Sequence, residues 1–449
     1  MSTTISGADT AWVLLSAGLV MLMVPGLALF YGGLVRSRSS LNTFMMSLAP
    51  LGFVTLQWVL FGYSLSFAPG RSWLGSLAWA GFSGVGAAPN ASYAATIPHL
   101  AFAVFQAMFA AITVALISGA VVERLKLRAY LAFIVLWATL VYDPLARWVW
   151  GDGGWLRALG ALDFAGGTVV HVSAGISALV AALVLGRRQD AGRAVIVPHN
   201  VPFTLVGAGL LWFGWFGFNG GSALAVGEIA TTAVVTTHVA AAAALATWVL
   251  LDLTVAGRAT AVGAATGAVV GLVAITPAAG FVTPLSAMAI GALGAGASFA
   301  AMQLRAKTRV DDALDVFACH GVGGIVGALL TGVFASKAVN PAGADGLLYG
   351  GSHLILAQFL AVAATLVLAG GMTFVVLHAI RAVMGLRVPM SDELRGLDVS
   401  EHGEAAYHGG DIGDLTGRRV PLGESVLLPA SDLRPPAVAA LEAAAPAAS

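Results

Sequence analysis

The chain has 449 residues, of which 58% are apolar and only 10% are charged, and its formal net charge is zero. A soluble globular protein carries about 25% charged residues, so this composition excludes an ordinary soluble domain and indicates a protein that crosses the membrane many times. The zero net charge gives no sign of nucleic-acid binding, and the single cysteine, Cys319, excludes an intramolecular disulfide framework and a cysteine-based zinc site.

Long apolar blocks, in place of short alternating segments, predict that the membrane spans are helices. The first ten residues lack the basic region and early cleavage site of a signal peptide, so we expect the first apolar run to be retained. We predict an all-α polytopic membrane protein with eleven transmembrane helices, at about 11–34, 43–67, 98–121, 128–147, 164–186, 201–219, 229–251, 260–276, 284–304, 313–335 and 353–384.

The basic residues of the loops predict the orientation, because cytoplasmic loops of membrane proteins are enriched in Lys and Arg. Loops after the odd-numbered spans carry Arg36, Arg38, Arg124, Lys126, Arg128, Arg187, Arg188, Arg193, Arg258, Arg305, Lys307 and Arg309. The alternate loops carry only Arg71, Arg147, Arg157 and Lys337. We therefore expect the N-terminus outside and the C-terminus inside.

One pattern of ionisable residues occurs twice. Asp163 precedes His171 by eight residues, and Asp312 precedes His320 by the same eight. Both patterns open an apolar span, and ionisable groups inside a bilayer are costly, so they are candidates for function.

The two copies are expected to run in opposite directions, because five spans separate them. Gly175 and Gly324 follow the two histidines at the same offset, and the ends of spans one and six, at 30–33 and 218–221, form a second matching pair. Such antiparallel copies are typical of inverted-repeat transporters. We predict that spans 1–5 and 6–10 form the two repeats and that span 11 is an addition.

The spacing also predicts the depth of the histidines. Eight residues of helix place each histidine roughly 12 Å from its aspartate. With Asp163 at the outer edge and Asp312 at the inner edge of a core of about 30 Å, both imidazoles approach the midplane. Repeat-built transporters have their substrate sites at this depth.

A pair of intramembrane histidines has two interpretations. They hold helices together, or they form a hydrogen-bonded relay, since a neutral imidazole donates with one nitrogen and accepts with the other. A relay suits the passage of a proton or of a small hydrogen-bonding molecule. A metal site is less favoured, because no third carboxylate or histidine stands at ligand spacing. The aspartates have a structural alternative as well, as caps of backbone N–H groups at helix starts.

Aromatic residues crowd the predicted outer ends of the spans, around Phe109, Trp150 and the stretch 212–218. An interfacial aromatic belt accounts for many tryptophans in membrane proteins, but it explains this stretch less well, because a glycine pair and Ser222 follow it. Aromatic faces bind cations with about 0.5–2 kcal/mol each. An aromatic site outside and a narrow apolar route within favour a cation that can lose a proton, and ammonium is such a cation.

Several motifs carry a resemblance to one family. They are PGLALFYGGLVR from Pro25, FQAMFAAITVALISGAVVER from Phe105, DFAGGTVVHVSAG from Asp163, GAGLLWFGWFGFNGGSA from Gly207, AITPAAGFV from Ala274 and DVFACHGVGGIVG from Asp315. With these motifs the chain resembles the ammonium transporters of the Amt/Mep/Rh family, and more closely the bacterial Amt branch. The resemblance covers about residues 10–410.

The resemblance implies roles for individual residues. Phe109, Trp150 and Ser222 would bind ammonium outside, with Asp163 supporting its recruitment and deprotonation. Phe109 and Phe218 would form a gate of stacked phenyl rings. The pore would contain His171, His320, Trp215, Thr276 and Gln106.

The resemblance also implies a domain organisation and partners. Residues 1–387 would form the transmembrane transporter domain and 388–449 a cytoplasmic tail, whose distal part we expect to be mobile. The protomer would form a homotrimer in the lipid bilayer of the cell (inner) membrane, with no cofactor, and a PII-type signal protein is a candidate cytoplasmic partner. The stretch after Gly410 departs from the family pattern.

Other functions are compatible with the same residues. An ammonium sensor would use the same site and pass a signal through its tail, but only about sixty residues follow span eleven, too few for most signalling domains. A membrane enzyme using the histidines would need a nucleophile or a metal, and neither is evident. A channel for carbon dioxide or another neutral gas is a variant of the transport hypothesis.

Overall fold

The computed structural model describes residues 4–191 and 197–407, and its regular elements within these ranges are helices. The first half contains α1 (Gly7–Leu34), η1 (Ser37–Ser39), α2 (Ser40–Gln57), η2 (Trp58–Gly62), α3 (Tyr63–Phe67), η3 (Ala80–Phe82), α4 (His99–Val121), α5 (Leu127–Trp137), η4 (Ala138–Tyr142), α6 (Asp143–Val149), α7 (Trp155–Ala158), η5 (Gly167–Val172) and α8 (Ser173–Leu185). The second half contains α9 (Val201–Trp215), η6 (Phe216–Gly220), α10 (Glu228–Ala256), α11 (Ala261–Ile275), α12 (Pro284–Ala306), η7 (Phe317–Val322), α13 (Gly323–Phe334), η8 (Leu347–Tyr349), α14 (His353–Met384), α15 (Met390–Arg395) and η9 (Asp398–His402).

The prediction of an all-helical membrane protein is confirmed. Ten helical segments of the described chain are long and apolar enough to cross a membrane. The predicted eighth span corresponds to α11, which has only 15 residues and is therefore roughly 22 Å long, shorter than a hydrocarbon core of about 30 Å. The count of eleven transmembrane helices stays a prediction for this reason.

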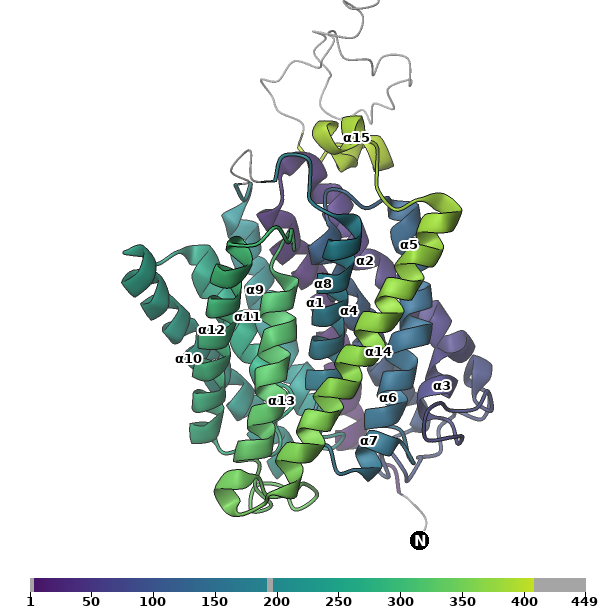
Figure 1. The fold of residues 1–449 in the computed structure, drawn as a ribbon. Coiled ribbons are helices and arrows are strands. Elements are labelled where there is room, and N and C mark those ends of the chain that lie inside the picture. The colour runs from purple at the N-terminus through teal and green to yellow at the C-terminus, as the bar shows by residue number, and fades with distance from the viewer. Residues whose placement is uncertain (1–3, 192–196, 408–449) are drawn as a thin grey trace, which may run out of the picture.

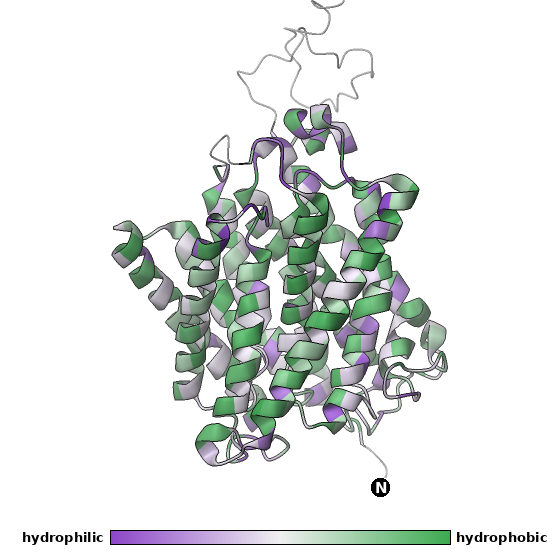
Figure 2. Ribbon diagram, in the orientation of Figure 1, coloured by the Kyte–Doolittle hydropathy of each residue, from purple (hydrophilic) through white to green (hydrophobic). Residues whose placement is uncertain are grey.

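The helices form one bundle whose long axes run between the two ends of the molecule (Figure 1). Helix α4 is its centre, with 89% of its apolar window buried, and it packs on α1, α2 and α8. Helix α10 lies at the periphery, where only 28% of its window is buried. Hydrophobic residues dominate the middle of the bundle and hydrophilic ones gather toward its ends (Figure 2), as a lipid environment requires.

The two segments that carry the repeated pattern cross in the middle of the bundle. Segment η5 packs on α13, and segment η7 packs on α8, so that each histidine-bearing turn contacts the helix that follows the other. Both η5 and η7 are π-helical turns, as are η2, η4, η6 and η9, so this geometry alone does not single out the histidine segments. The reciprocal packing is what an inverted repeat requires, and the N-terminus and α15 lie at opposite ends of the bundle (Figure 1).

The start of the tail packs against the end of the bundle opposite the N-terminus. The carboxylate of Asp398 accepts hydrogen bonds from the backbone N–H groups of Leu41 (3.1 Å) and Asn42 (2.8 Å), and it thereby caps α2. Glu401 accepts one from the N–H of Leu127, the first residue of α5, at 2.8 Å. These contacts attach the tail to two membrane helices. The distal tail, expected to be mobile, lies outside the described residues.

Candidate functional site: an aromatic vestibule and a histidine-lined cavity

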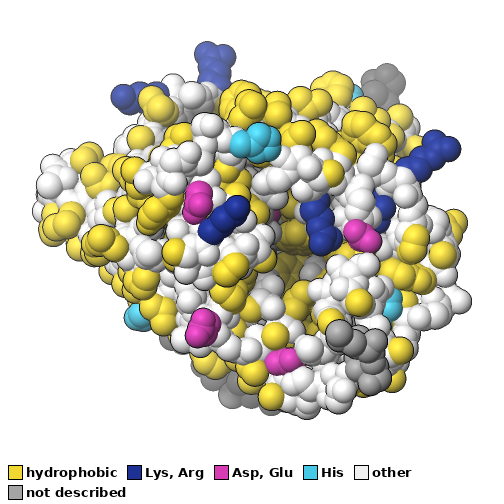
Figure 3. All heavy atoms as spheres, turned by 90° about the horizontal axis from the view of Figure 1, so that it is seen from below, with side chains coloured by type: hydrophobic (Ala, Val, Ile, Leu, Met, Phe, Trp, Pro, Cys, Tyr) yellow, Lys and Arg dark blue, Asp and Glu magenta, His cyan; other side chains and the backbone are white. Residues whose placement is uncertain are grey.

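A vestibule of about 480 Å³ opens on the face of the molecule that carries the N-terminus. Figure 3 shows this face hollowed near its middle, with hydrophobic side chains inside the hollow and cationic ones at its edge. Residues expected at the external site line it together, and they come from four separate segments: Phe109, Trp150, Asp163 and Ser222. Gln106, which was expected in the pore, also lines this vestibule. The fold therefore brings these residues together around one vestibule.

The aromatic side chains of the vestibule are held in fixed positions. Trp150, which follows the last turn of α6, donates from its indole nitrogen to the backbone carbonyl of Asp163 at 2.9 Å. Its ring stands edge-on to that of Phe109, with the centroids 6.1 Å apart and an interplanar angle of 89°. The hydroxyl of Ser222 donates to the carbonyl of Phe218 at 2.8 Å, which leaves its oxygen lone pairs free to accept from a ligand.

Asp163 has the geometry of a structural cap. One of its carboxylate oxygens accepts from the backbone N–H groups of Gly166 (2.8 Å) and Gly167 (2.5 Å). The other accepts from the N–H groups of Thr168 (2.8 Å) and Val169 (3.2 Å) and from the Thr168 hydroxyl. The carboxylate therefore fixes the start of η5 at the wall of the vestibule.

Two phenyl rings separate the vestibule from the interior. Phe109 of α4 and Phe218 of η6 stack with their centroids 4.3 Å apart and an interplanar angle of 29°. Both are buried, with 1% and 0% of their surface exposed. Stacked rings at this distance leave no room for a molecule to pass between them, so passage requires that at least one ring rotates.

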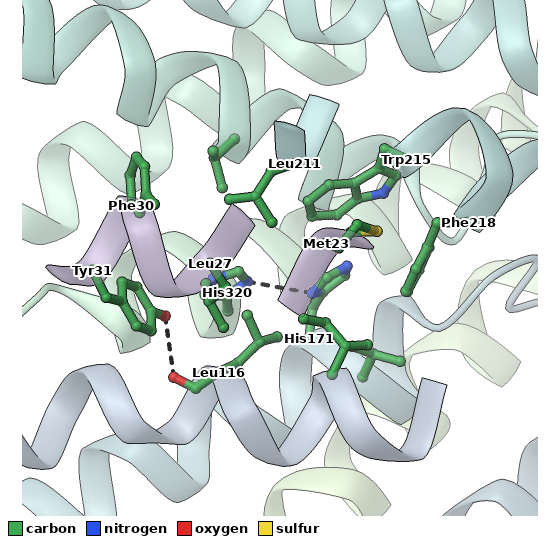
Figure 4. A pocket seen from close by; sticks show the side chains of 13 residues that line it. Met23, Leu27, Phe30, Tyr31, Leu116, His171, Leu211, Trp215, Phe218 and His320 are labelled. Carbon is green, nitrogen blue, oxygen red and sulfur yellow. Dashed lines mark hydrogen bonds between the residues drawn. The ribbon is translucent and has the colours of Figure 1, made fainter. Parts of the chain in front are cut away.

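Beyond the rings lies a small closed cavity that contains both repeat histidines (Figure 4). Its volume is about 10 Å³, which is close to the smallest space that holds one water molecule. The imidazoles point toward one another, and their Nδ1 atoms are 3.3 Å apart. The remaining walls are mostly apolar, formed by Met23, Leu27, Phe30, Tyr31, Ile112, Leu116, Val170, Leu211, Trp215, Phe218 and Val269. The sequence prediction that the two histidines meet is thus matched by the geometry.

The close pair of Nδ1 atoms constrains the protons of the two rings. One Nδ1 must carry a hydrogen and the other must accept it, so in a pair of neutral rings the two Nε2 atoms differ. On the ring that donates from Nδ1, Nε2 is an acceptor; on the other ring, Nε2–H is a donor. His171 Nε2 is buried and has no hydrogen-bond partner among the described residues. It is available to a molecule that enters the cavity.

A hydrogen bond joins the side chains of Trp215 and Thr276. The Trp215 ring lies against that of His171, with the centroids 5.4 Å apart and an interplanar angle of 24°. Its indole nitrogen donates to the Thr276 hydroxyl at 2.9 Å. Trp215 lines the cavity, whereas Thr276 does not and instead holds the Trp215 ring in place.

Some residues of the site were not assigned from the sequence. Tyr31 lines the inner cavity and donates from its hydroxyl to the carbonyl of Leu116 at 3.1 Å. It lies in the motif that begins at Pro25, which carried the family resemblance but did not indicate a role for this tyrosine. The π-helical turns at both histidines had no recognisable signal, because hydrophobic periodicity does not distinguish one π-turn from an α-helix.

The residues from 4 to 191 and from 197 to 407 contain no group of three or more His, Cys, Asp or Glu side chains that could hold a metal ion. An aromatic vestibule, a ring gate and a narrow apolar cavity within a membrane helix bundle define a class of protein, a multi-pass membrane transporter for a very small solute. Residues 11–407 match the Ammonium Transporter Family. The chain belongs to this family.

Similar proteins cover almost the whole chain. An ammonium transporter of Bacillus subtilis is 51% identical over 400 residues, which are 89% of this chain and 98% of that protein. The ammonium transporter Amt1 of Archaeoglobus fulgidus is 44% identical over 90% of this chain and 100% of its own length. Among solved structures, Saccharomyces cerevisiae Mep2 superposes with a TM-score of 0.82 and 37% identity, over 87% of this chain and 89% of that one. A structure described as a sensor Amt protein gives 0.81 and 30%, over 88% and 98%.

Proposed function

We propose that the protein binds ammonium in the vestibule, releases its proton near the ring gate and conducts ammonia through the histidine-lined cavity into the cytoplasm of the cell. The unpartnered Nε2 of His171 supports this proposal most directly, because a buried polar atom without a hydrogen bond costs about 1–3 kcal/mol. A passing hydrogen-bonding molecule removes that cost temporarily. Ammonia suits the site, since it both donates and accepts.

The vestibule is suited to the charged form of the substrate. Phe109 and Trp150 present aromatic surface that attracts a cation, and the Ser222 oxygen accepts one of its hydrogens. The capped carboxylate of Asp163 adds a negative field from below without contact to the substrate.

The inner cavity is suited to the neutral form. A permanent cation would have to leave its water and enter an apolar space, which is costly inside a membrane. Ammonia carries no charge, so its transfer from water costs much less, and hydrogen bonds to His171 and then His320 offset that cost. The shared hydrogen between the two Nδ1 atoms also allows a proton to cross the pair by a change of tautomer. Transport with or without a separate proton is compatible with this geometry.

The homotrimer forms part of the proposal. His238 lies on the exposed face of α10, ten residues from its first residue and therefore roughly 15 Å into the helix. Its ring lies beside Trp212, with the centroids 5.4 Å apart. A polar side chain that faces lipid at this depth is unfavourable, so coverage of this face by another copy of the chain is favoured. A PII-type partner rests on the family resemblance, and binding of such a protein to the purified transporter would test it.

The proposal is tested by current measurements on purified protein in liposomes after a step in ammonium, with potassium as the control. A transient that grows with ammonium and not with potassium means that charge moves; an internal rise in pH without current means that ammonia crosses without its proton. His171→Ala or His320→Ala should change the rate or the transported species while the protein stays folded. Wild-type uptake of ammonium and methylammonium by both variants would exclude the relay.

A second candidate is a sensor, which the likeness to the sensor Amt protein favours because the two folds agree over 88% of this chain. The same liposome experiment separates the two. Ammonium binding without current and without a pH change would mean that the protein senses ammonium and does not transport it.

A further inference from the structure

A second hollow lies beside the vestibule on the same face. It is a cavity of about 350 Å³ that shares a wall with the vestibule, because Phe67, Ser92 and Tyr93 line both. Arg147 and Asp152 line this second cavity and not the vestibule. The family motifs and the proposed transport route do not use it.

Arg147 is a buried cation without a counterion. Only 2% of its surface is exposed, and no carboxylate of the described chain lies within 4.0 Å of its guanidinium. Its Nε donates to the carbonyl of Arg71 at 3.0 Å and its Nη1 to the carbonyl of Ala68 at 3.1 Å. A guanidinium has five N–H groups, so three are left over, and neutral carbonyls do not cancel the charge.

The loop formed by residues 151–154 packs closely around Arg147. A Cβ atom on Gly151 would lie 2.6 Å from Arg147 Cδ, and one on Gly154 would overlap the Arg147 carbonyl oxygen. Gly153, which has a φ of +78°, lines the cavity, and a Cβ atom there would be 3.6 Å from Arg147 Nη2. Nη2 therefore lies next to the cavity wall. Gly151 and Gly154 allow the loop to approach Arg147 this closely, and the positive φ of Gly153 also favours glycine.

Asp152 is at the exposed side of the same cavity. Its carboxylate accepts from the Ser92 hydroxyl at 3.2 Å, and its backbone N–H donates to the Tyr93 hydroxyl at 3.0 Å. Its charge disfavours any multiply charged anion beside it. The cavity therefore presents a guanidinium with free N–H groups and, at its rim, a carboxylate that limits the charge of an occupant.

We propose that this cavity binds a small monovalent oxyanion of the carboxylate type, held by the free N–H groups of Arg147. The planar guanidinium matches two oxygens of such an anion with two parallel hydrogen bonds, which a spherical ion does not reproduce. The bound anion neutralises a cation in a cavity that shares a wall with the ammonium vestibule. Binding of the anion does not depend on the proposed transport function, but its consequence for ammonium does.

The direct experiment measures binding of ¹³C-labelled acetate to the full-length protein in phosphatidylcholine nanodiscs by NMR line broadening, without ammonium. Wild-type protein and Arg71→Gln, which removes an exposed cation from the neighbouring loop, should both bind. Arg147→Gln should abolish binding. Asp152→Asn should tighten binding about three- to tenfold, because it removes the competing carboxylate while Arg147 and its carbonyl contacts stay in place.

Asp152→Asn keeps the test decisive if Arg147→Gln does not fold. Unchanged acetate binding in Asp152→Asn, or no binding by the wild type, would overturn the proposal. Displacement of acetate by an equal concentration of chloride would overturn the oxyanion preference. Loss of acetate binding only in phosphatidylglycerol nanodiscs would identify a lipid headgroup as the occupant and overturn a soluble one.

The consequence for ammonium is measured separately. The repulsion between two positive charges about 10 Å apart in water, such as Arg147 and a bound ammonium ion, weakens ammonium binding by about twofold. Bound acetate cancels the charge of Arg147. Acetate in place of chloride should therefore lower the half-saturating ammonium concentration of wild-type uptake by about that factor. Arg147→Gln should show no such dependence. Acetate binding with unchanged uptake would leave the site in place and overturn only its link to transport.

Discussion

Gly175 of α8 lies directly against Gly321 of η7, so closely that a Cβ atom on Gly175 would overlap the Gly321 backbone nitrogen. The other half has the reciprocal contact, because a Cβ atom on Gly324 would lie 3.0 Å from both the Gly167 carbonyl oxygen and His171 Cβ. Each glycine thus allows the turn that carries the opposite histidine to approach. This crossing places the two Nδ1 atoms 3.3 Å apart.

Gly175→Val should therefore disrupt the site from a distance. The added side chain overlaps backbone of η7, which cannot move without displacing His320, and overpacking of this kind costs about 1–3 kcal/mol. We expect a lower unfolding temperature in detergent and a loss of most ammonium uptake. Gly209→Val is the matched control, since Gly209 is also a helical glycine but has no atom within 4 Å of its Cβ position. Equal unfolding temperatures of the two variants would contradict the close contact between Gly175 and the backbone of η7.

Trp150→Leu should weaken the apparent affinity for ammonium more than the maximal rate. Leucine keeps apolar bulk but removes the aromatic face beside Phe109, and the face contributes about 0.5–2 kcal/mol, which corresponds to roughly a two- to thirtyfold higher half-saturation. The measurement is uptake into liposomes over a range of ammonium concentrations. Trp73→Leu, an exposed tryptophan that does not line the vestibule, is the control. An unchanged half-saturation would argue against an aromatic cation site.

Sequence patterns were informative where one residue type repeats at a fixed spacing. The two Asp–His spacings predicted that His171 and His320 meet, because an inverted repeat places equivalent residues about one axis. The apolar blocks located the helices to within several residues, although the short α11 left the number of spans open. These features depend on local composition and on symmetry.

Other features depend on contacts between segments that are distant in sequence. Eight residues of regular helix were expected between Asp163 and His171, but the helix begins only at Gly167, in a π-turn that the Asp163 carboxylate caps. The hydrogen bond from Trp215 to the Thr276 hydroxyl could not be predicted either, because the two residues are 61 positions apart in sequence. Neither periodicity nor composition encodes such pairs.

Asp163→Ala should destabilise the protein before it affects substrate binding. The carboxylate accepts four backbone N–H groups and one hydroxyl, and each buried donor left without a partner costs about 1–3 kcal/mol. We expect little folded protein after purification in detergent, measured by size-exclusion chromatography and thermal unfolding. Asp152→Ala, at an exposed carboxylate on the same face, should purify normally. Stable, folded Asp163→Ala that only fails to bind ammonium would show that the role of this carboxylate is in recruitment.

Thr276→Val should affect transport through Trp215. The substitution keeps the shape of the side chain but leaves the buried indole N–H without its acceptor, at a cost of about 1–3 kcal/mol. Because the Trp215 ring lies against His171, we expect a severalfold fall in the maximal rate with a nearly unchanged half-saturation. Thr266→Val tests the substitution itself, since Thr266 lies within α11, which Thr276 follows, but its hydroxyl bonds only to a carbonyl of its own turn. If Thr276→Val and Thr266→Val lower the maximal rate equally, Thr276 does not act on transport by positioning Trp215.

The ion pairs at the end of the bundle opposite the N-terminus predict a dependence of protein stability on pH. Burial of Asp311 opposes its ionisation, but hydrogen bonds and charge from Arg188 lower the pKa of Asp311 to about 2. Because this pKa is below the ordinary value of 3.8, the ionised carboxylate stabilises the folded state above about pH 4, and this stabilisation is lost as the pH falls toward 2. Asp311→Asn should therefore have a free energy of unfolding that is lower than that of the wild type at pH 7, by on the order of 2 kcal/mol. It should also unfold at a lower temperature. The gap between the two proteins should narrow steadily between pH 4 and pH 2, whereas Glu404→Gln, at an exposed carboxylate of the tail, should match the wild type throughout. A gap that stays constant down to pH 2 would mean that Asp311 acts by its shape and hydrogen bonds and not by its charge.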